Sequence, residues 1–131
     1  MNLTTILTNA LVEYLESENI GVFGTDIFIG TRPSEPIDCL TLYNTGGFPP
    51  QKDTTSDPTI QIISRSEEYL DGLTKLFDVH DLFKEKYGFW LDSDGIWVIK
   101  MEAQGEPGQM GKDSNGHHLF SANYHLWVRY Y

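Results

Sequence analysis

The chain has 131 residues, of which 40% are hydrophobic and 21% charged, and nine Lys and Arg against nineteen Asp and Glu give a net charge of −10. This length predicts one domain with its own hydrophobic core, and this composition excludes global disorder. The acidic surplus opposes binding to phosphate backbones and to anionic membrane surfaces, because such binding depends on Lys and Arg.

The first expected element is a helix near the N-terminus, where apolar residues recur at intervals of three and four. The stripe consists of Leu3, Ile6, Leu7, Ala10, Leu11, Tyr14 and Leu15. Asn2 is expected to cap the helix, because its side chain can accept a hydrogen bond from a free backbone N–H group. No stretch of the chain approaches the roughly 20 apolar residues of a membrane-spanning helix, and the N-terminus lacks the features of a secretion signal.

Short strands are expected next, each with two aliphatic residues on one face. They cover residues 26–30, 39–43 and 59–64. Pro33 and Pro36 separate the first two strands, since proline cannot donate a ladder hydrogen bond. Residues 44–57 are rich in Gly, Pro and Thr, and we expect them to form a long exposed loop.

A second helix is expected over residues 66–87, with either a capping box of Ser64 and Glu67 or Ser66 as its N-cap. Its inner stripe is predicted to consist of Tyr69, Leu70, Leu73, Leu76, Phe77, His80 and Phe83. Gly72 costs a helix about 1 kcal/mol relative to Ala, so we expect another element to pack closely against it. Gly88 is expected just beyond the end of the helix.

Two long strands end the chain, over residues 96–103 and 119–130, and each has an apolar residue at every second position. The predicted inward sets are Trp97, Ile99, Met101 and Ala103 in the first strand and Phe120, Ala122, Tyr124, Leu126, Val128 and Tyr130 in the second. The order of elements predicts an α+β domain, with a mainly antiparallel β-sheet and two α-helices packed on one face. Its core is expected to bring together Leu7, Leu11, Leu73, Phe77, Ile99, Tyr124 and Leu126.

The sequence contains no catalytic, cofactor-binding or metal-binding motif that we recognise. Cys39 lies in a predicted strand without a basic neighbour, which favours a structural cysteine over a nucleophile. His117, His118 and His125 lack the spacing of zinc ligands, and His80 belongs to the helix stripe. We therefore expect no catalytic, cofactor or metal site. A small enzyme with a pocket around His80 or His125 remains an alternative.

Six segments spread along nearly the whole chain carry a further signal. They are Tyr14-Leu15; Asp26-Ile27-Phe28-Ile29-Gly30 followed by Pro33 and Pro36; Leu42-Tyr43-Asn44-Thr45-Gly46-Gly47; Pro58-Thr59-Ile60-Gln61-Ile62 leading to Arg65; Gln104-Gly105-Glu106-Pro107 with Gly111 and Asp113; and Phe120-Ser121-Ala122-Asn123-Tyr124. In this order and spacing the chain resembles a family of small phage proteins described as minor capsid or tail-terminator (tail-completion) proteins. The resemblance implies that residues 1–131 form a single tail-terminator-like domain of α+β fold, and it transfers no active site.

The resemblance also implies a function in assembly. A protein of this family forms a ring, usually a hexamer, at the head-proximal end of the tail tube, where it stops tube polymerisation and joins the tail to the head. The implied partners are further copies of the chain, the tail tube protein and a head-side connector or stopper protein. The implied location is the tail and neck of the virion, and the host cytoplasm during assembly. DNA would pass through the ring without specific binding, which suits an acidic wall.

Two other classes of protein stay open beside the small enzyme. One is an acidic DNA mimic that inhibits a nucleic-acid enzyme, and the other is a different component of the head–tail neck.

The connection over residues 104–117 is longer than a usual hairpin loop and is expected to project from the end of the sheet. Its glycines make it adaptable, whereas Pro107 restricts it, and the apolar Met110 gains nothing unless a partner covers it. We therefore expect this loop to reach a neighbouring subunit or the tube, the alternative being a disordered surface loop. The candidate interface residues are Gly105, Pro107, Met110, Asp113 and Trp127.

Overall fold

The computed structural model describes residues 3–48, 55–92 and 95–131. Within these ranges the elements are α1 (Leu3–Ser17), β1 (Ile27–Ile29), β2 (Cys39–Phe48), β3 (Thr55–Ser66), α2 (Tyr69–Phe83), β4 (Glu85–Asp92), β5 (Ile96–Ala103), β6 (Gly108–Lys112) and β7 (His118–Tyr130). The strands form one sheet in the order β1-β2-β3-β7-β5-β4, with β6 paired to β7. β1 runs parallel to β2, and the other named pairs are antiparallel.

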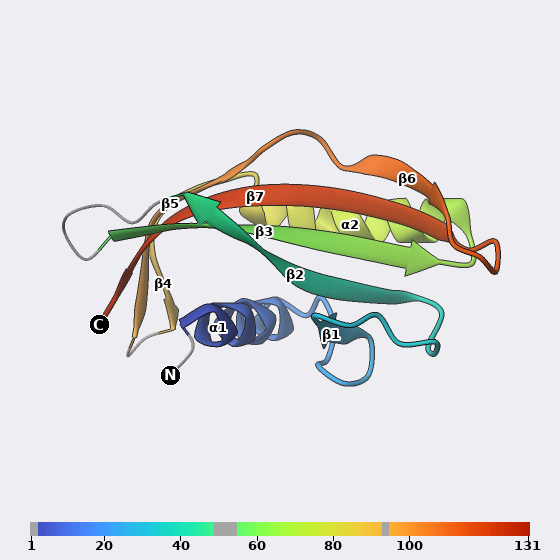
Figure 1. Cartoon of the computed structure of the whole chain (residues 1–131), viewed down its shortest axis with the longest axis horizontal. Coiled ribbons are helices and arrows are strands. Elements are labelled where there is room, and N and C mark those ends of the chain that lie inside the picture. Colours follow the sequence, from blue (N-terminus) through green and yellow to red (C-terminus); the bar gives the residue numbers. More distant parts are fainter. Residues whose placement is uncertain (1–2, 49–54, 93–94) are drawn as a thin grey trace.

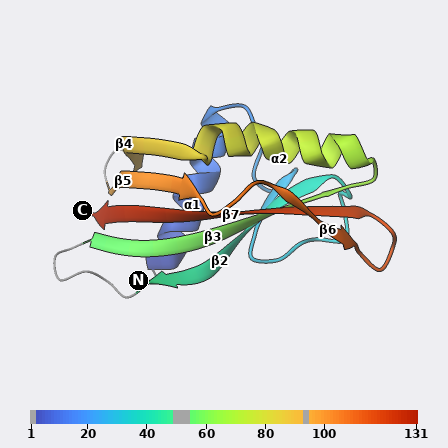
Figure 2. The same ribbon diagram turned by 90° about the horizontal axis from the view of Figure 1, so that it is seen from above.

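Both helices pack against one face of this curved sheet. α2 lies along β7, whereas α1 lies between β1 and β4, the two edge strands (Figures 1 and 2). Phe83 of α2 joins the layers: its ring centroid is 5.9 Å from that of Tyr14 in α1 and 5.7 Å from that of Tyr124 in β7. The predicted α+β class is therefore confirmed.

The period-2 pattern of the last strand is also correct. Phe120, Ala122, Tyr124, Leu126 and Val128 are all buried on the helix side of β7. Burial of this continuous apolar row is the main stabilising contribution of the strand, since each large side chain removed from water adds roughly 1.5–3 kcal/mol. We call the opposite side of the sheet, on which no helix packs in the described part of the chain, the helix-free face.

The predicted core is only partly correct. Leu7, Leu11, Tyr124 and Leu126 are buried. Leu73, Phe77 and Ile99 are not: Leu73 is half-buried, and the other two are exposed over more than a third of their surface.

A β-bulge explains the error at Ile99. The register with β7 moves from Val98–Val128 to Lys100–Trp127, so Ile99 is an extra residue on the β5 side. A bulge of this kind reverses the alternation of inward and outward side chains. Val98 is consequently buried before the bulge, and Trp97, predicted to face inward, lies on the helix-free face.

The second helix is shorter than predicted. α2 ends at Phe83, and Glu85–Asp92 form the edge strand β4, which the sequence reading missed. Gly88, expected as the residue after the helix, lies inside β4 with a φ of +55°, a conformation that favours glycine. Lys84 is the single residue between α2 and β4, so the chain passes directly from the helix into the sheet.

At Gly72, α2 packs closely against the sheet. A Cβ atom there would collide with Ser66 Oγ and lie 3.0 Å from Phe120 Cε2, which confirms the predicted close packing. The expected capping is wrong, because the N-cap is Glu68 and makes no side-chain capping bond. Ser64 Oγ instead donates to the carbonyl of Gly72 at 2.9 Å, and Ser66 Oγ donates to that of Glu68 at 2.6 Å.

Much of the predicted loop over residues 44–57 is strand. β2 continues to Phe48 across a bulge between Asn44 and Gly47, and β3 already begins at Thr55. The remainder of this prediction, residues 49–54, lies outside the described residues, as does the predicted cap Asn2.

The connection over residues 104–117 also differs from its prediction. β3 pairs with one edge of β7. β5 and β6 both pair with the other edge of β7, one after the other along its length. Gly108–Lys112 is thus hydrogen-bonded to β7, and residues 113–117 alone form the turn. The expectation that the whole connection projects from the end of the sheet is wrong.

Candidate functional site

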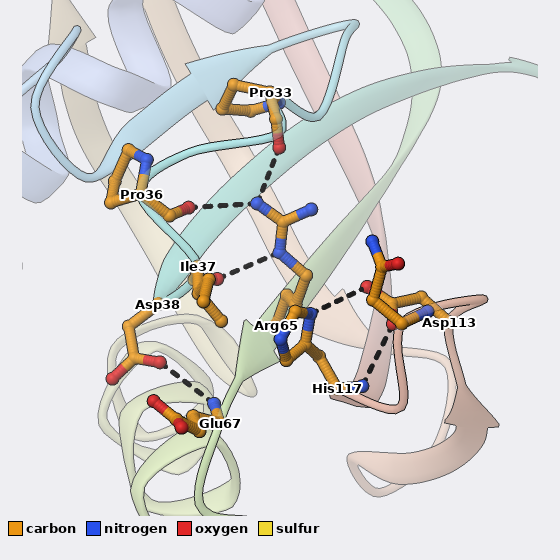
Figure 3. Close-up of polar contacts among 9 residues, drawn as sticks. Pro33, Pro36, Ile37, Asp38, Arg65, Glu67, Asp113 and His117 are labelled. Carbon is orange, nitrogen blue, oxygen red and sulfur yellow. Dashed lines mark hydrogen bonds and ion pairs between the residues drawn. The ribbon is translucent and has the colours of Figure 1, made fainter.

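One candidate surface lies at the end of the sheet where Arg65 holds the segment between β1 and β2. Its Nε donates to the carbonyl of Ile37 at 2.8 Å, and its Nη2 donates to the carbonyls of Pro36 at 2.8 Å and Pro33 at 2.5 Å (Figure 3). Arg65 itself is 6% exposed. A planar guanidinium can serve several acceptors at once, so one buried side chain fixes the path of this loop.

Further contacts order the same end of the molecule. Asp38 Oδ1 accepts a hydrogen bond from the backbone N–H of Glu67 at 2.9 Å and so ties the loop to the start of α2. In the turn before β7, Asp113 accepts from the backbone N–H groups of His117 and Asn115, each at 2.9 Å. These bonds lower the pKa of Asp113, the one from His117 most. The two ordered loops lie on either side of Arg65 (Figure 3).

A second candidate surface lies on the helix-free face, where β4, β5 and the C-terminus meet. Trp90, Trp97, Ile99, Arg129 and Tyr131 line a shallow hollow of about 460 Å³. We call these five residues the aromatic patch. The Trp90 ring centroid lies 5.1 Å from that of Trp97 and 5.6 Å from that of Tyr131. Trp, Tyr and Arg are the side chains enriched at the energetic centres of protein interfaces.

A row of rings extends from this patch across the helix-free face. Trp127 stacks on His125 with 3.6 Å between ring centroids, and the Phe48 ring centroid lies 4.7 Å from that of His125. Lys100 Nζ lies 5.1 Å from the centroid of the Trp127 ring. His125 Nε2 is 3.9 Å from Oδ1 of the buried Asp57. Burial lowers the pKa of His125, and the nearby Asp57 carboxylate acts in the opposite direction.

The predicted interface residues fall into two places. Gly105 and Met110 are exposed along the β5–β6 edge of β7, Pro107 between them is buried, and Asp113 lies in the following turn. Trp127 is separate, because it is half-buried on the helix-free face beside the aromatic patch.

Sequence reasoning missed Trp90 as a surface residue because it did not recognise β4. The available signal was Phe89 and Leu91, which alternate with Trp90 as in a half-buried strand. Extending the helix to Tyr87 concealed this short pattern.

Cys39 and His80, which the sequence offered as candidates for catalysis, are buried in the packed interior of the fold. Cys39 is buried, and burial raises the pKa of its thiol, which disfavours the reactive thiolate. His80 is buried against Tyr124. Among the described residues there is no group of three or more His, Cys, Asp or Glu that could hold a metal ion. Nor does any helix in those ranges have the length and apolar character needed to cross a membrane.

Comparison with protein families gives a match over residues 14–129 to a family described as bacteriophage tail terminator protein. This range runs from the second half of α1 almost to the end of β7 and so includes both candidate surfaces except Tyr131. Comparison with curated proteins gives no match.

Proposed function

The chain belongs to the bacteriophage tail terminator family and is thus a structural protein of the phage tail, and from this premise we propose that it caps the tail tube as a ring. The ring is hexameric and lies at the head-proximal end of the tube. It ends tube polymerisation and joins the tail to a head-side connector or stopper protein. Assembly takes place in the host cytoplasm, and the finished ring stays in the neck of the virion.

The aromatic patch is the observation that carries this proposal. Trp90 and Tyr131 are 47% and 70% exposed, and Ile99 beside them is exposed as well. Soluble monomers rarely leave a large contiguous apolar surface uncovered, whereas subunit interfaces are built around such aromatic and Arg residues. A neighbouring copy in the ring would remove these side chains from water.

The surfaces ordered by Arg65 and β6 suit contact with the tube or connector. The Arg65 bonds fix the loop before binding, so a partner does not have to overcome the entropy of ordering it. The exposed Met110 lies on β6, whose free edge is flanked by Gly105 and the turn at Asp113. We assign the predicted interface residues of this region to contacts with the tube or a neighbouring subunit.

The charge of the chain suits a channel that DNA crosses. A net charge of −10 makes the ring wall repel the duplex rather than hold it. DNA therefore passes through the ring without specific binding.

Light scattering after size exclusion, with and without the tail tube protein of the same virus, tests the proposal. We expect a closed oligomer of six copies, alone or on the tube, and loss of this oligomer in the variant Trp90→Glu. The matched control is Val22→Glu, which adds the same charge at an exposed apolar residue outside the patch. A chain that stays monomeric under both conditions contradicts the proposal, and a monomer that inhibits a nucleic-acid enzyme supports the DNA-mimic alternative.

A further inference from the structure

α2 carries a second apolar row that its own fold covers only in part. The buried side of the helix consists of Gly72, Leu76, Val79, His80 and Phe83. Leu70, Leu73 and Phe77 follow the spacing i, i+3, i+7 and form a second row, which we call the α2 ridge. Leu70 is 70% exposed and Phe77 36% exposed. An exposed apolar row on a helix is the form in which helices dock into grooves of other proteins.

Carboxylates border this ridge. Asp81 follows Phe77 at i+4 and extends the same row, while Asp78 lies in the adjoining row, two turns after Leu70. Both aspartates are exposed. Asp81 is 3.6 Å from Lys84 Nζ, but both of these side chains are largely in solvent, so the pair leaves Asp81 available to a partner. A surface that receives the ridge must therefore be apolar with a cation beside it.

The aromatic patch has these properties. Its hollow is walled by Trp90, Trp97, Ile99 and Tyr131, and Arg129 contributes a guanidinium next to Trp97, its partner across the strands. Lys100 lies nearby over the Trp127 ring, but Glu102 pairs with it at 3.1 Å, so Arg129 is the cation that the hollow itself contains. An apolar ridge bordered by two aspartates thus corresponds to an apolar hollow whose lining includes one guanidinium.

The two surfaces lie on opposite faces of the sheet. α2 packs against the side to which Phe120 and Tyr124 point, whereas Trp97 and Arg129 belong to the helix-free face. One copy therefore cannot place its own ridge in its own patch. Contact between two different surfaces on opposite faces is heterologous, and such contacts close into rings when the rotation between copies permits.

We propose that the α2 ridge of one copy docks in the aromatic patch of the next copy, with Asp78 and Asp81 facing Arg129. This inference rests on the proposed ring and defines its subunit contact. Leu70 and Phe77 supply the apolar centre of the contact, and the charged pairs set its orientation, since charge complementarity contributes mainly to specificity.

Cysteine cross-linking of two variants tests the contact directly. Leu70→Cys and Tyr131→Cys place thiols on the two surfaces at positions that are each 70% exposed, and the native Cys39 is buried and does not compete. Under mild oxidation of the assembled ring, we expect a disulfide-linked dimer when the two variants are mixed and none from either variant alone. A mixture of Val22→Cys with Tyr131→Cys is the matched control and should give no dimer.

A charge exchange supplies an independent measurement. Arg129→Glu alone, or Asp78→Arg with Asp81→Arg, should weaken assembly by roughly 10-fold or more, because each change places like charges opposite one another. Combining all three substitutions in one chain should restore assembly to near the wild-type level, since every contact again joins opposite charges. Matching circular dichroism spectra will show that the variants are folded.

The possible results separate this inference from the proposed function. A wild-type ring that yields no mixed cross-link, or one in which Leu70→Cys links to itself, overturns the ridge-in-patch contact while the ring stands. A wild-type chain that forms no oligomer with or without the tail tube protein overturns the ring itself.

Discussion

His80 Nδ1 lies 3.0 Å from the hydroxyl oxygen of Tyr124, and both side chains are buried between α2 and β7. This bond joins the helix to the middle of the sheet. Burial raises the pKa of Tyr124 far above its usual value of 10.0, so the phenol stays protonated. A buried polar pair of this kind stabilises the fold only while both partners are present.

Tyr124→Phe should therefore destabilise the domain. The substitution keeps the ring but leaves a buried imidazole nitrogen without its partner, which costs about 1–3 kcal/mol. Urea denaturation measures the change, with the exposed Tyr87→Phe as control. Equal midpoints for the two variants would show that the His80 bond contributes nothing.

Gly72→Ala should also destabilise the domain, although alanine is the better helix former. The gain in helix propensity is about 1 kcal/mol, but overpacking against Ser66 and Phe120 costs about 1–3 kcal/mol. Gly108→Ala is a suitable comparison, because no other group lies within 4 Å of a Cβ atom at that position. If Gly72→Ala raises the thermal midpoint, the close approach of α2 to the sheet is wrong.

Arg65→Lys should release the loop between β1 and β2. Lysine keeps the charge but cannot reproduce the planar fork that serves three carbonyls, and each lost charged hydrogen bond costs about 1.5–3 kcal/mol. Limited proteolysis should cut residues 31–38 faster than in the wild type. Arg32→Lys, on the same segment but outside this set of bonds, should leave the cleavage rate unchanged; equal rates for both variants would contradict the assignment.

His125 should make stability depend on pH. Burial holds its folded pKa below the usual value of 6.5, so the unfolded chain takes up this proton first as the pH falls. The free energy of unfolding is thus unaffected by this residue above pH 6.5 and declines below it, until the folded pKa is passed. Denaturation from pH 7.5 to 5 should show a shallower decline for His125→Phe, which keeps a ring between Phe48 and Trp127. Parallel curves for this variant and the wild type would exclude the effect.

Duplex DNA should not bind to the isolated chain at physiological salt. The chain has nine Lys and Arg residues, and some of them already bind other groups in the fold. Arg65 donates hydrogen bonds to backbone carbonyls, and Lys100 forms an ion pair with Glu102 at 3.1 Å. Too few counterions would be released to outweigh repulsion by the acidic surplus. Fluorescence anisotropy with a random duplex measures this, and submicromolar, salt-sensitive binding would contradict it.

The sequence by itself determined the fold class and the principal strands. The alternation from Phe120 to Val128 identifies the inward face of β7, and the stripe through Leu7 and Leu11 identifies the buried face of α1. Such periodicity is visible in the sequence because an element that buries one side needs apolar residues only on that side. The resemblance to the tail terminator family could also be found from the sequence, because it depends only on the order and spacing of segments along the chain.

Only the tertiary structure decided which apolar residues are left uncovered. Leu70 and Phe77 are indistinguishable in sequence from the buried Leu76, because α2 has an apolar arc wider than the area that the sheet can cover. The bulge at Ile99 and the edge strand containing Trp90 arise from pairing with distant parts of the chain, which local periodicity does not encode. The aromatic patch and the α2 ridge therefore become visible as surfaces once the strands are paired and the helices are packed.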